Sequence, residues 1–332
     1  MAQIQRSISL SDGFLARTVT KRPYRQMLRA RLDSLTNWVT GSSMALACAL
    51  LLVVAGTLIY RAWPIISTRP LTTLVFSDTW HPTNGAFGFG PFIIGSLYVT
   101  VLAMALAVPA ALFSAIYLAE YASFRTLIKP LVDLLASIPS VIYGLWGVLF
   151  IVPLVRDHVA PWADQTLGQT LPLFANNNPT GYGIFSAGIV LAIMVYPIIV
   201  SVTVEVLSSV PQGMREASLA LGATQWETTK FVVTRKALPG MIAATVLGFS
   251  RAFGETLAVL MVVGNVVQVP GSVFDAAYPL PALIANNYGE MMSIPLYDAA
   301  LMTAALLLLL VVMFFNIGAR LILDRFERTV TV

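Results

Sequence analysis

An arginine and a glutamate stand four residues apart, as Arg251 and Glu255, inside a segment that is otherwise apolar. Positions i and i+4 share one face of an α-helix, so the two side chains are predicted to meet. Charged side chains within a membrane span are costly and usually face the interior of a bundle or a watery cavity. Because a guanidinium presents paired donors that match an oxyanion, we expect Arg251, beside Ser250, to meet an anion in transit.

A second interpretation of the same pair needs no ligand. Two charges of opposite sign neutralise each other, which lets both exist inside a membrane. The two interpretations are compatible. The ion pair can hold a closed state of the protein, and Arg251 can exchange Glu255 for an anion when the anion arrives. Glu255 then restrains Arg251 or restores the closed state. Counted from Leu238 at the helical rise, Arg251 lies about 20 Å along its span, near the middle of a membrane.

Composition places the chain in a membrane. Of its 332 residues 57% are apolar and 11% are charged, whereas soluble domains carry about 25% charged residues. The single cysteine, Cys48, excludes an intramolecular disulfide and a cysteine-based metal cluster, and the two histidines, His81 and His158, exclude a histidine-rich metal site. No Walker A motif is present, so we expect no bound ATP, no cofactor and no metal. The net charge is +4. The distribution of the basic residues indicates that they orient the chain in a membrane and do not bind nucleic acid.

The apolar segments predict an all-α, polytopic membrane protein with six transmembrane helices. Three outer loops are expected at residues 68–90, 156–181 and 270–295. The predicted spans cover residues 44–60, 92–118, 131–155, 182–207, 238–267 and 296–322.

The basic residues predict the orientation of these spans. Most of the 20 Lys and Arg residues fall in the N-terminal tail, the short turns and the C-terminal end, and only Arg61, Arg69 and Arg156 fall in the outer loops. This asymmetry follows the positive-inside rule and places both termini in the cytoplasm. We divide the chain into a basic N-terminal segment (1–42), a six-span domain (43–323) with a cytoplasmic loop (208–238), and a tail (324–332).

The loop between the fourth and fifth spans has its own local signals. Pro211 suits the first turn of a helix, and Gly222 suits a left-handed C-cap that ends it. Thr224 and Glu227 have the spacing of a capping box that starts a second helix. Leu238-Pro239-Gly240 is expected to interrupt the chain before the next span. This loop either forms a docking surface for another protein or is simply a solvated connection between two spans.

Glu216-Ala217-Ser218, Gly222 and Ala237-Leu238-Pro239-Gly240 together resemble the "EAA…G…LP" signature of permease subunits of bacterial ABC importers. The resemblance implies a MetI-like fold and a short helix that docks into a groove of a separate ATPase subunit. It assigns coupling to the ATPase to five residues, Arg215, Glu216, Ala217, Ser218 and Gly222. We expect hinges at Pro239, Gly240 and Pro139.

Residues 248–259, 138–147 and the Trp80-His81-Pro82 run also resemble motifs of the PstC-type permeases of bacterial phosphate importers, over about residues 43–322. The resemblance implies that Arg251 and Glu255 are needed for phosphate passage. It further implies a cytoplasmic-membrane location and partners: the lipid bilayer, a second homologous permease, an ATP-binding subunit dimer and an extracytoplasmic phosphate-binding protein. ATPase closure would pull the Glu216–Gly222 elbow and re-aim the fourth and fifth spans.

Three alternatives remain at this stage. A permease for another tetrahedral oxyanion, such as molybdate or sulfate, has the same needs, because an arginine does not choose among these anions by itself. A membrane-embedded enzyme would have to use Asp133, Glu205, Glu255 or the histidines, and no paired-carboxylate or His-Glu-x-x-His spacing supports it. A self-sufficient ion-coupled carrier would show internal repeats or more spans. We therefore expect a transport subunit and not an enzyme.

Overall fold

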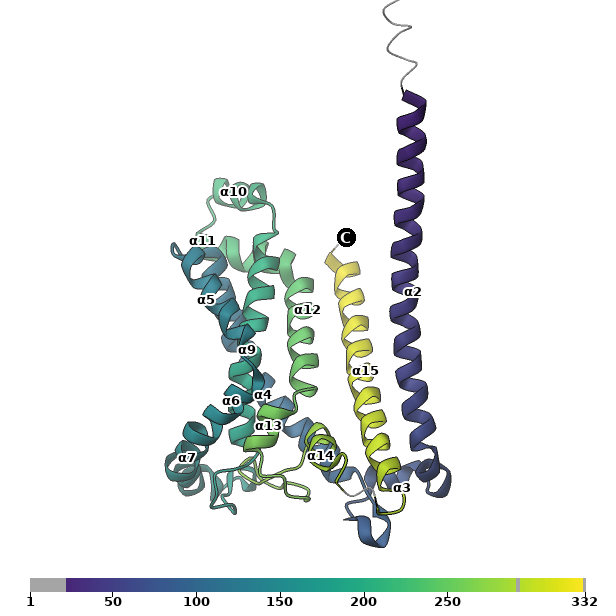
Figure 1. Cartoon of the computed structure of the whole chain (residues 1–332). Helices are drawn as coiled ribbons and strands as arrows, with labels where there is room; N and C mark the ends of the chain where they lie inside the picture. The colour runs from purple at the N-terminus through teal and green to yellow at the C-terminus, as the bar shows by residue number, and fades with distance from the viewer. Residues whose placement is uncertain (1–21, 291–292, 331–332) are drawn as a thin grey trace, which may run out of the picture. The chain divides into compact units, whose positions relative to one another are not determined.

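The structure is a computed structural model that describes residues 22–290 and 293–330. The chain divides into two compact units, residues 1–57 and 58–332. The described part of the first unit is helical and belongs to α2 (Arg22–Thr68) (Figure 1). Residues 1–21 of the predicted basic segment lie outside the described residues.

Among the described residues, six helical stretches are long and apolar enough to cross a membrane, which confirms the predicted number. The first is longer than predicted at both ends, since it runs from Leu32 to Thr68 within α2. The six stretches are Leu32–Thr68, Gly90–Glu120, Ser140–Gly168, Ile184–Ser208, Gln225–Phe253 and Tyr297–Gly318.

The expected first outer loop contains short regular elements that pack around one indole. Trp80 contacts Phe87 edge-on, with ring centroids 5.5 Å apart, and Phe92 at 4.9 Å. This aromatic cluster fixes the start of α4, the long second span. The elements are α3 (Leu71–Phe76), β1 (Trp80–His81), a 3₁₀ turn (Pro82–Asn84), β2 (Ala86–Phe87) and α4 (Gly90–Glu120).

The predicted bounds of the third span are wrong at both ends. Its first residues belong to a separate helix, α5 (Arg125–Ser137), and the chain is extended at Ile138 and Pro139 before α6 (Ser140–Trp146) begins. Proline disfavours the helical conformation of the residue before it, which explains the break. The helix then runs past Arg156 to Gly168, through α7 (Val152–Leu154), α8 (Ala160–Ala163) and π-helical turns at Gly147–Ile151, Val155–Val159 and Asp164–Gly168.

The fifth span is interrupted at a different place from the one predicted. A continuous helix runs through α11 (Gln225–Glu227), a π-helical turn (Thr228–Val233) and α12 (Thr234–Phe253), so the interruption expected at Pro239 is wrong. The helix packs closely on the fourth span, α9 (Ile184–Ser208), and continues through Pro239. The chain breaks instead after Phe253 and resumes as α13 (Leu257–Val262).

Gly240 and Gly248 are two positions at which α12 approaches α9 closely. A Cβ on Gly240 would lie 2.4 Å from Val206 Cγ1, and one on Gly248 would lie 2.6 Å from Ile199 Cγ1. Small residues of this kind let two helices in a membrane approach closely. Gly240 therefore serves the packing of the fourth span on the fifth.

In the second unit, α4, α9 and α12 form the centre of the fold. The loop helix α10 (Gln212–Ala220) lies at one end of α9, and α13 lies at the other end (Figure 1). A second apolar cluster joins the start of α4 to the last span, α15 (Tyr297–Val330), and to α14 (Leu280–Asn287). A 3₁₀ turn (Pro172–Phe174) completes the helical elements.

Candidate functional site

The predicted contact between Arg251 and Glu255 is present, but not on one helix. The guanidinium nitrogen Nη2 lies 3.8 Å from Glu255 Oε2. Arg251 is in the last turn of α12, whereas Glu255 lies in the break before α13. Because the helix ends between them, the prediction that the two residues share one helical face is wrong. At this distance the two side chains form an ion pair but no hydrogen bond.

The two charged side chains differ in exposure. The Glu255 side chain is 7% exposed and the Arg251 side chain is 50% exposed in the single chain. Glu255 Oε1 accepts a bond of 3.4 Å from the Ala258 N–H at the start of α13. Within the described residues, the Arg251 side chain donates no hydrogen bond. Its guanidinium N–H groups are therefore available to donate hydrogen bonds to an anion.

A residue that the sequence analysis missed lies beside this pair. The Ser250 hydroxyl contacts the Asn316 carbonyl oxygen Oδ1 across the α12–α15 interface. Next to it, Phe249 packs on Phe315 with ring centroids 4.8 Å apart. The signal was available, because an amide within an apolar span usually bonds to another helix. Ser250 therefore attaches α12 to the last span immediately before Arg251.

We predict that Asn316→Leu loosens this attachment. A hydrogen bond between membrane helices contributes about 0.6–2 kcal/mol, so the apparent melting temperature of the purified protein in detergent should fall. Thr303→Val is the matched control, because that hydroxyl bonds only to Ala299 O within α15. Equal melting temperatures for Asn316→Leu and the wild type would contradict the assignment.

The loop between α9 and α11 follows its local signals, except that Pro211 is the N-cap of the helix and not part of its first turn. Helix α10 runs from Gln212 to Ala220, and Gly222 follows with a positive φ of 88°. The Thr224 hydroxyl accepts a bond of 3.2 Å from the Glu227 N–H, and the Glu227 carboxylate accepts one of 2.8 Å from the Thr224 N–H. The predicted capping box is confirmed.

We predict that Thr224→Ala destabilises the start of the helix that carries α11. Loss of an N-cap hydroxyl costs about 1 kcal/mol, so amide hydrogen exchange across residues 224–230 should accelerate severalfold. Ser209→Ala serves as the control, since the Ser209 hydroxyl bonds back to Val206 O within its own helix. Unchanged exchange in Thr224→Ala would show that the cap adds nothing.

The five residues assigned to coupling do not share one environment. Glu216 and Ala217 are exposed on α10, and Gly222 is exposed at the elbow. Ser218 is half-buried, and its hydroxyl lies 2.9 Å from the Thr228 hydroxyl of the following helix. Arg215 differs from all of these, because its side chain is only 14% exposed. The outward-facing residues suit a docking surface, and Arg215 points inward.

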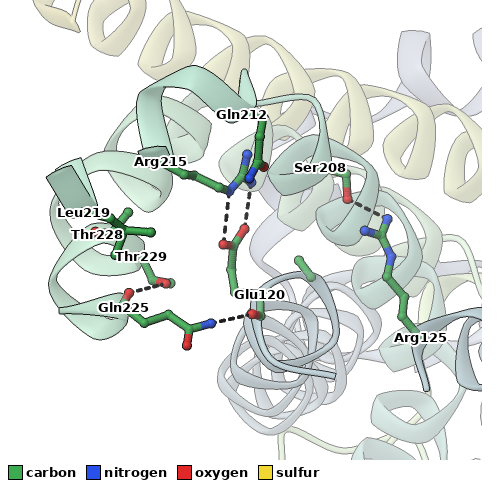
Figure 2. Close-up of a pocket in the computed structure, with 10 residues that line it drawn as sticks. Glu120, Arg125, Ser208, Gln212, Arg215, Leu219, Gln225, Thr228 and Thr229 are labelled. Carbon is green, nitrogen blue, oxygen red and sulfur yellow. Dashed lines mark hydrogen bonds and ion pairs between the residues drawn. The ribbon is translucent and has the colours of Figure 1, made fainter. Parts of the chain in front are cut away.

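Arg215 borders a polar pocket at the end of the fold that carries α10 (Figure 2). The pocket has a volume of about 430 Å³. Arg125 reaches it from α5 and donates a bond of 2.6 Å to the Ser208 hydroxyl. The pocket is lined by Ala119, Glu120, Arg125, Ser208, Gln212, Arg215, Leu219, Gln225, Thr228 and Thr229.

The carboxylates considered as catalytic groups of an enzyme each have a different partner and do not come together in one site. Asp133 accepts a bond of 2.6 Å from the Ser201 hydroxyl, and Glu205 accepts one of 3.0 Å from Lys129. Both contacts join α5 to α9, whereas Glu255 lies in the break before α13. In the part of the chain that the structure describes, no group of three metal-binding side chains occurs.

Among the expected hinges, Pro139 lies at an actual bend, between α5 and α6, whereas Pro239 and Gly240 lie within α12. Gly144 and Gly147 of the same third-span segment pack against other helices. A Cβ on Gly144 would lie 2.7 Å from Met261 Sδ, and one on Gly147 would lie 2.6 Å from Val190 Cγ2. These two glycines therefore serve packing between spans.

Comparisons with known proteins agree with this architecture. Residues 107–332 match the family model described as "Binding-protein-dependent transport system inner membrane component". Inward-facing structures of the MetNI methionine ABC transporter align with a TM-score of 0.50 at 20% identity, covering 70% of this chain and 93% of that chain. That likeness concerns the fold alone.

Three curated relatives cover most of the chain. The phosphate transport system permease protein PstC of Haemophilus influenzae is 34% identical, over 90% of this chain and 95% of the relative. PstC of Pasteurella multocida is 36% identical, over 84% and 88% respectively. The probable phosphate transport system permease protein PstC of Methanocaldococcus jannaschii is 33% identical, over 85% and 90%.

The six apolar helical stretches and the helical loop between α9 and α12 define a multi-pass membrane permease. The chain belongs to the family of binding-protein-dependent transport system inner membrane components.

Proposed function

We propose that the chain is the permease subunit of an ATP-driven phosphate importer and forms half of its translocation pathway. The similarity to phosphate permeases over most of the chain carries this proposal. The half-exposed Arg251 supports it, because a guanidinium with free donors, placed where a helix breaks, can hold a phosphate-like anion. The choice of phosphate over molybdate or sulfate rests on the relatives.

The proposed assembly follows from the family. A second homologous permease completes the pathway, an ATP-binding subunit dimer hydrolyses ATP, and an extracytoplasmic binding protein delivers phosphate. The chain itself acts as a transport subunit without enzymatic activity. The exposed residues Glu216, Ala217 and Gly222 form the surface that meets the ATPase, and Pro139 serves as a hinge. Pro239 and Gly240 keep a hinge role only if the α9–α12 contact opens during transport.

The proposed setting is the bacterial cytoplasmic membrane, with both termini and α10 on the cytoplasmic side. The distribution of basic residues supports this orientation. A single cysteine at Ser218 in a Cys48→Ala background tests it. A membrane-impermeant maleimide should label inverted vesicles and leave intact spheroplasts unlabelled. Labelling from outside the cell would overturn the orientation.

Radiolabelled phosphate uptake tests the function itself. Cells that lack their own phosphate permease should regain uptake when they express this chain with its partner subunits. Excess unlabelled phosphate should compete, whereas equal concentrations of molybdate or sulfate should not. Competition by molybdate or sulfate alone would assign the chain to another oxyanion, and no uptake in the presence of all subunits would contradict the proposal.

A further inference from the structure

Glu120, the last residue of α4, holds the loop of residues 208–238, which carries α10 and is called the coupling loop below, through its side chain. Its carboxylate accepts two bonds from Arg215 of α10, from Nη2 to Oε1 at 2.7 Å and from Nε to Oε2 at 3.1 Å (Figure 2). The Glu120 side chain is 8% exposed. Two parallel bonds between a guanidinium and a carboxylate fix orientation as well as distance. The contact therefore sets the position of α10 on the end of the second span.

Arg215 also binds the end of the fourth span. Its guanidinium donates to Leu207 O at 2.9 Å and to Val210 O at 2.6 Å. Carbonyl groups at a helix C-terminus lack partners within the helix, and a cation there is favourable. One side chain thus joins α10, the C-terminal end of α9 and the C-terminal end of α4.

The second half of the loop is attached to the same glutamate. The Gln225 amide nitrogen Nε2 donates a bond of 2.8 Å to the Glu120 backbone oxygen (Figure 2). Gln225 begins α11, beyond the glycine elbow. Both sides of the elbow are therefore tied to Glu120, one through its side chain and one through its carbonyl group.

Apolar packing does not explain how α10 is held. None of the residues of α10 is buried, and Leu221 just after it is 89% exposed. The neighbouring ion pair between Lys129 and Glu205 is 30% and 64% exposed, and exposed pairs of this kind contribute little. Polar contacts link α10 to the spans away from solvent, among them the Ser218–Thr228 hydroxyl contact to the fifth span and the buried ion pair between Arg215 and Glu120 to the second span.

We propose that Glu120 is a positioning residue that fastens the coupling loop to α4, so that a displacement of α10 moves the second span together with the fourth. The resemblance to the phosphate importer permeases implied movement of the fourth and fifth spans only. Because α4 packs along both α9 and α12, a pull on Glu120 acts on the centre of the fold. The inference rests on the proposed function, since it needs an ATPase that moves α10.

The test measures phosphate transported per ATP hydrolysed by the complete importer in liposomes. Glu120→Gln keeps the carbonyl that Gln225 uses and removes the charge that holds Arg215. The ratio should fall about fivefold or more, as when two sites lose their coupling, while ATP hydrolysis continues. Lys129→Gln is the matched control, because it breaks an exposed ion pair at the same end of the fold, and it should keep the wild-type ratio.

A second pair of measurements keeps the test decisive if Glu120→Gln assembles poorly. Cysteines at Glu120 and Arg215, in a Cys48→Ala background, are joined by a reducible bifunctional linker. The linked protein should transport more phosphate per ATP than the same protein after reduction. Equal ratios in both states, or a wild-type ratio in Glu120→Gln, would overturn the role of Glu120. A wild-type importer that moves no phosphate would instead contradict the proposed function.

Discussion

Arg251→Gln should abolish most phosphate uptake without preventing assembly of the importer. The substitution keeps hydrogen-bond donors but removes the charge that faces the anion. A hydrogen bond to a charged group contributes about 1.5–3 kcal/mol, so loss of the contact between the guanidinium and the anion corresponds to about tenfold or more. Initial rates of radiolabelled phosphate uptake, at equal amounts of protein in the membrane, should fall by at least that factor.

Two further variants separate the pathway role from simple charge neutralisation. Arg251→Lys keeps a cation and should retain part of the uptake, although it loses the paired donors. Arg156→Gln is the matched control, because that arginine is also 50% exposed and pairs with Asp157 at 2.7 Å. It should transport at the wild-type rate. Normal uptake by Arg251→Gln would remove Arg251 from the pathway and leave only the neutral pair.

The elements that could be predicted are those with a local cause. Long apolar runs identified six spans, because a helix must present apolar side chains along its whole length in lipid. Gly222 and the Thr224–Glu227 box fixed the elbow, since their signals act within four residues of each other. These features need no knowledge of what packs against them.

The two prolines show why local signals were insufficient elsewhere. Pro139 breaks the chain, whereas Pro239 lies within a continuous helix. Next to Pro239, α9 approaches closely at Gly240, and only the three-dimensional structure reveals that contact. The break after Phe253, where Gly254 is the C-cap, was also missed, and it changed the geometry of the Arg251–Glu255 pair.

No local signal in the sequence marks Glu120 as a contact of the loop that carries α10. Its partner Arg215 lies 95 positions further along the chain, and no spacing rule joins residues so far apart. Asn316 is a partial exception, because an amide in an apolar span already indicates a contact between helices. That signal was not used in the sequence analysis, and the structure identified both Asn316 and its partner Ser250.

Gly240→Ala should destabilise the protein, although alanine normally favours a helix over glycine by about 1 kcal/mol. The new Cβ would lie 2.4 Å from Val206 Cγ1 and 2.9 Å from Cγ2, and overpacking of this kind typically costs about 1–3 kcal/mol. Gly213→Ala is the matched control, since a Cβ at Gly213 of α10 meets nothing within 4 Å. Its melting temperature in detergent should stay the same or rise.

Val206→Ala should rescue the Gly240 variant, because it removes the two methyl groups that the new Cβ would meet. The double variant should therefore be more stable than the sum of the single changes predicts, and a double-mutant cycle measures this difference. If Gly240 is a hinge, the expected pattern is the opposite. The stiffer Gly240→Ala variant would then have an unchanged or higher melting temperature but a lower rate of uptake. Val206→Ala would change neither effect. Thermal unfolding of the four proteins, compared with their uptake rates, decides whether this glycine serves contact between spans or bending.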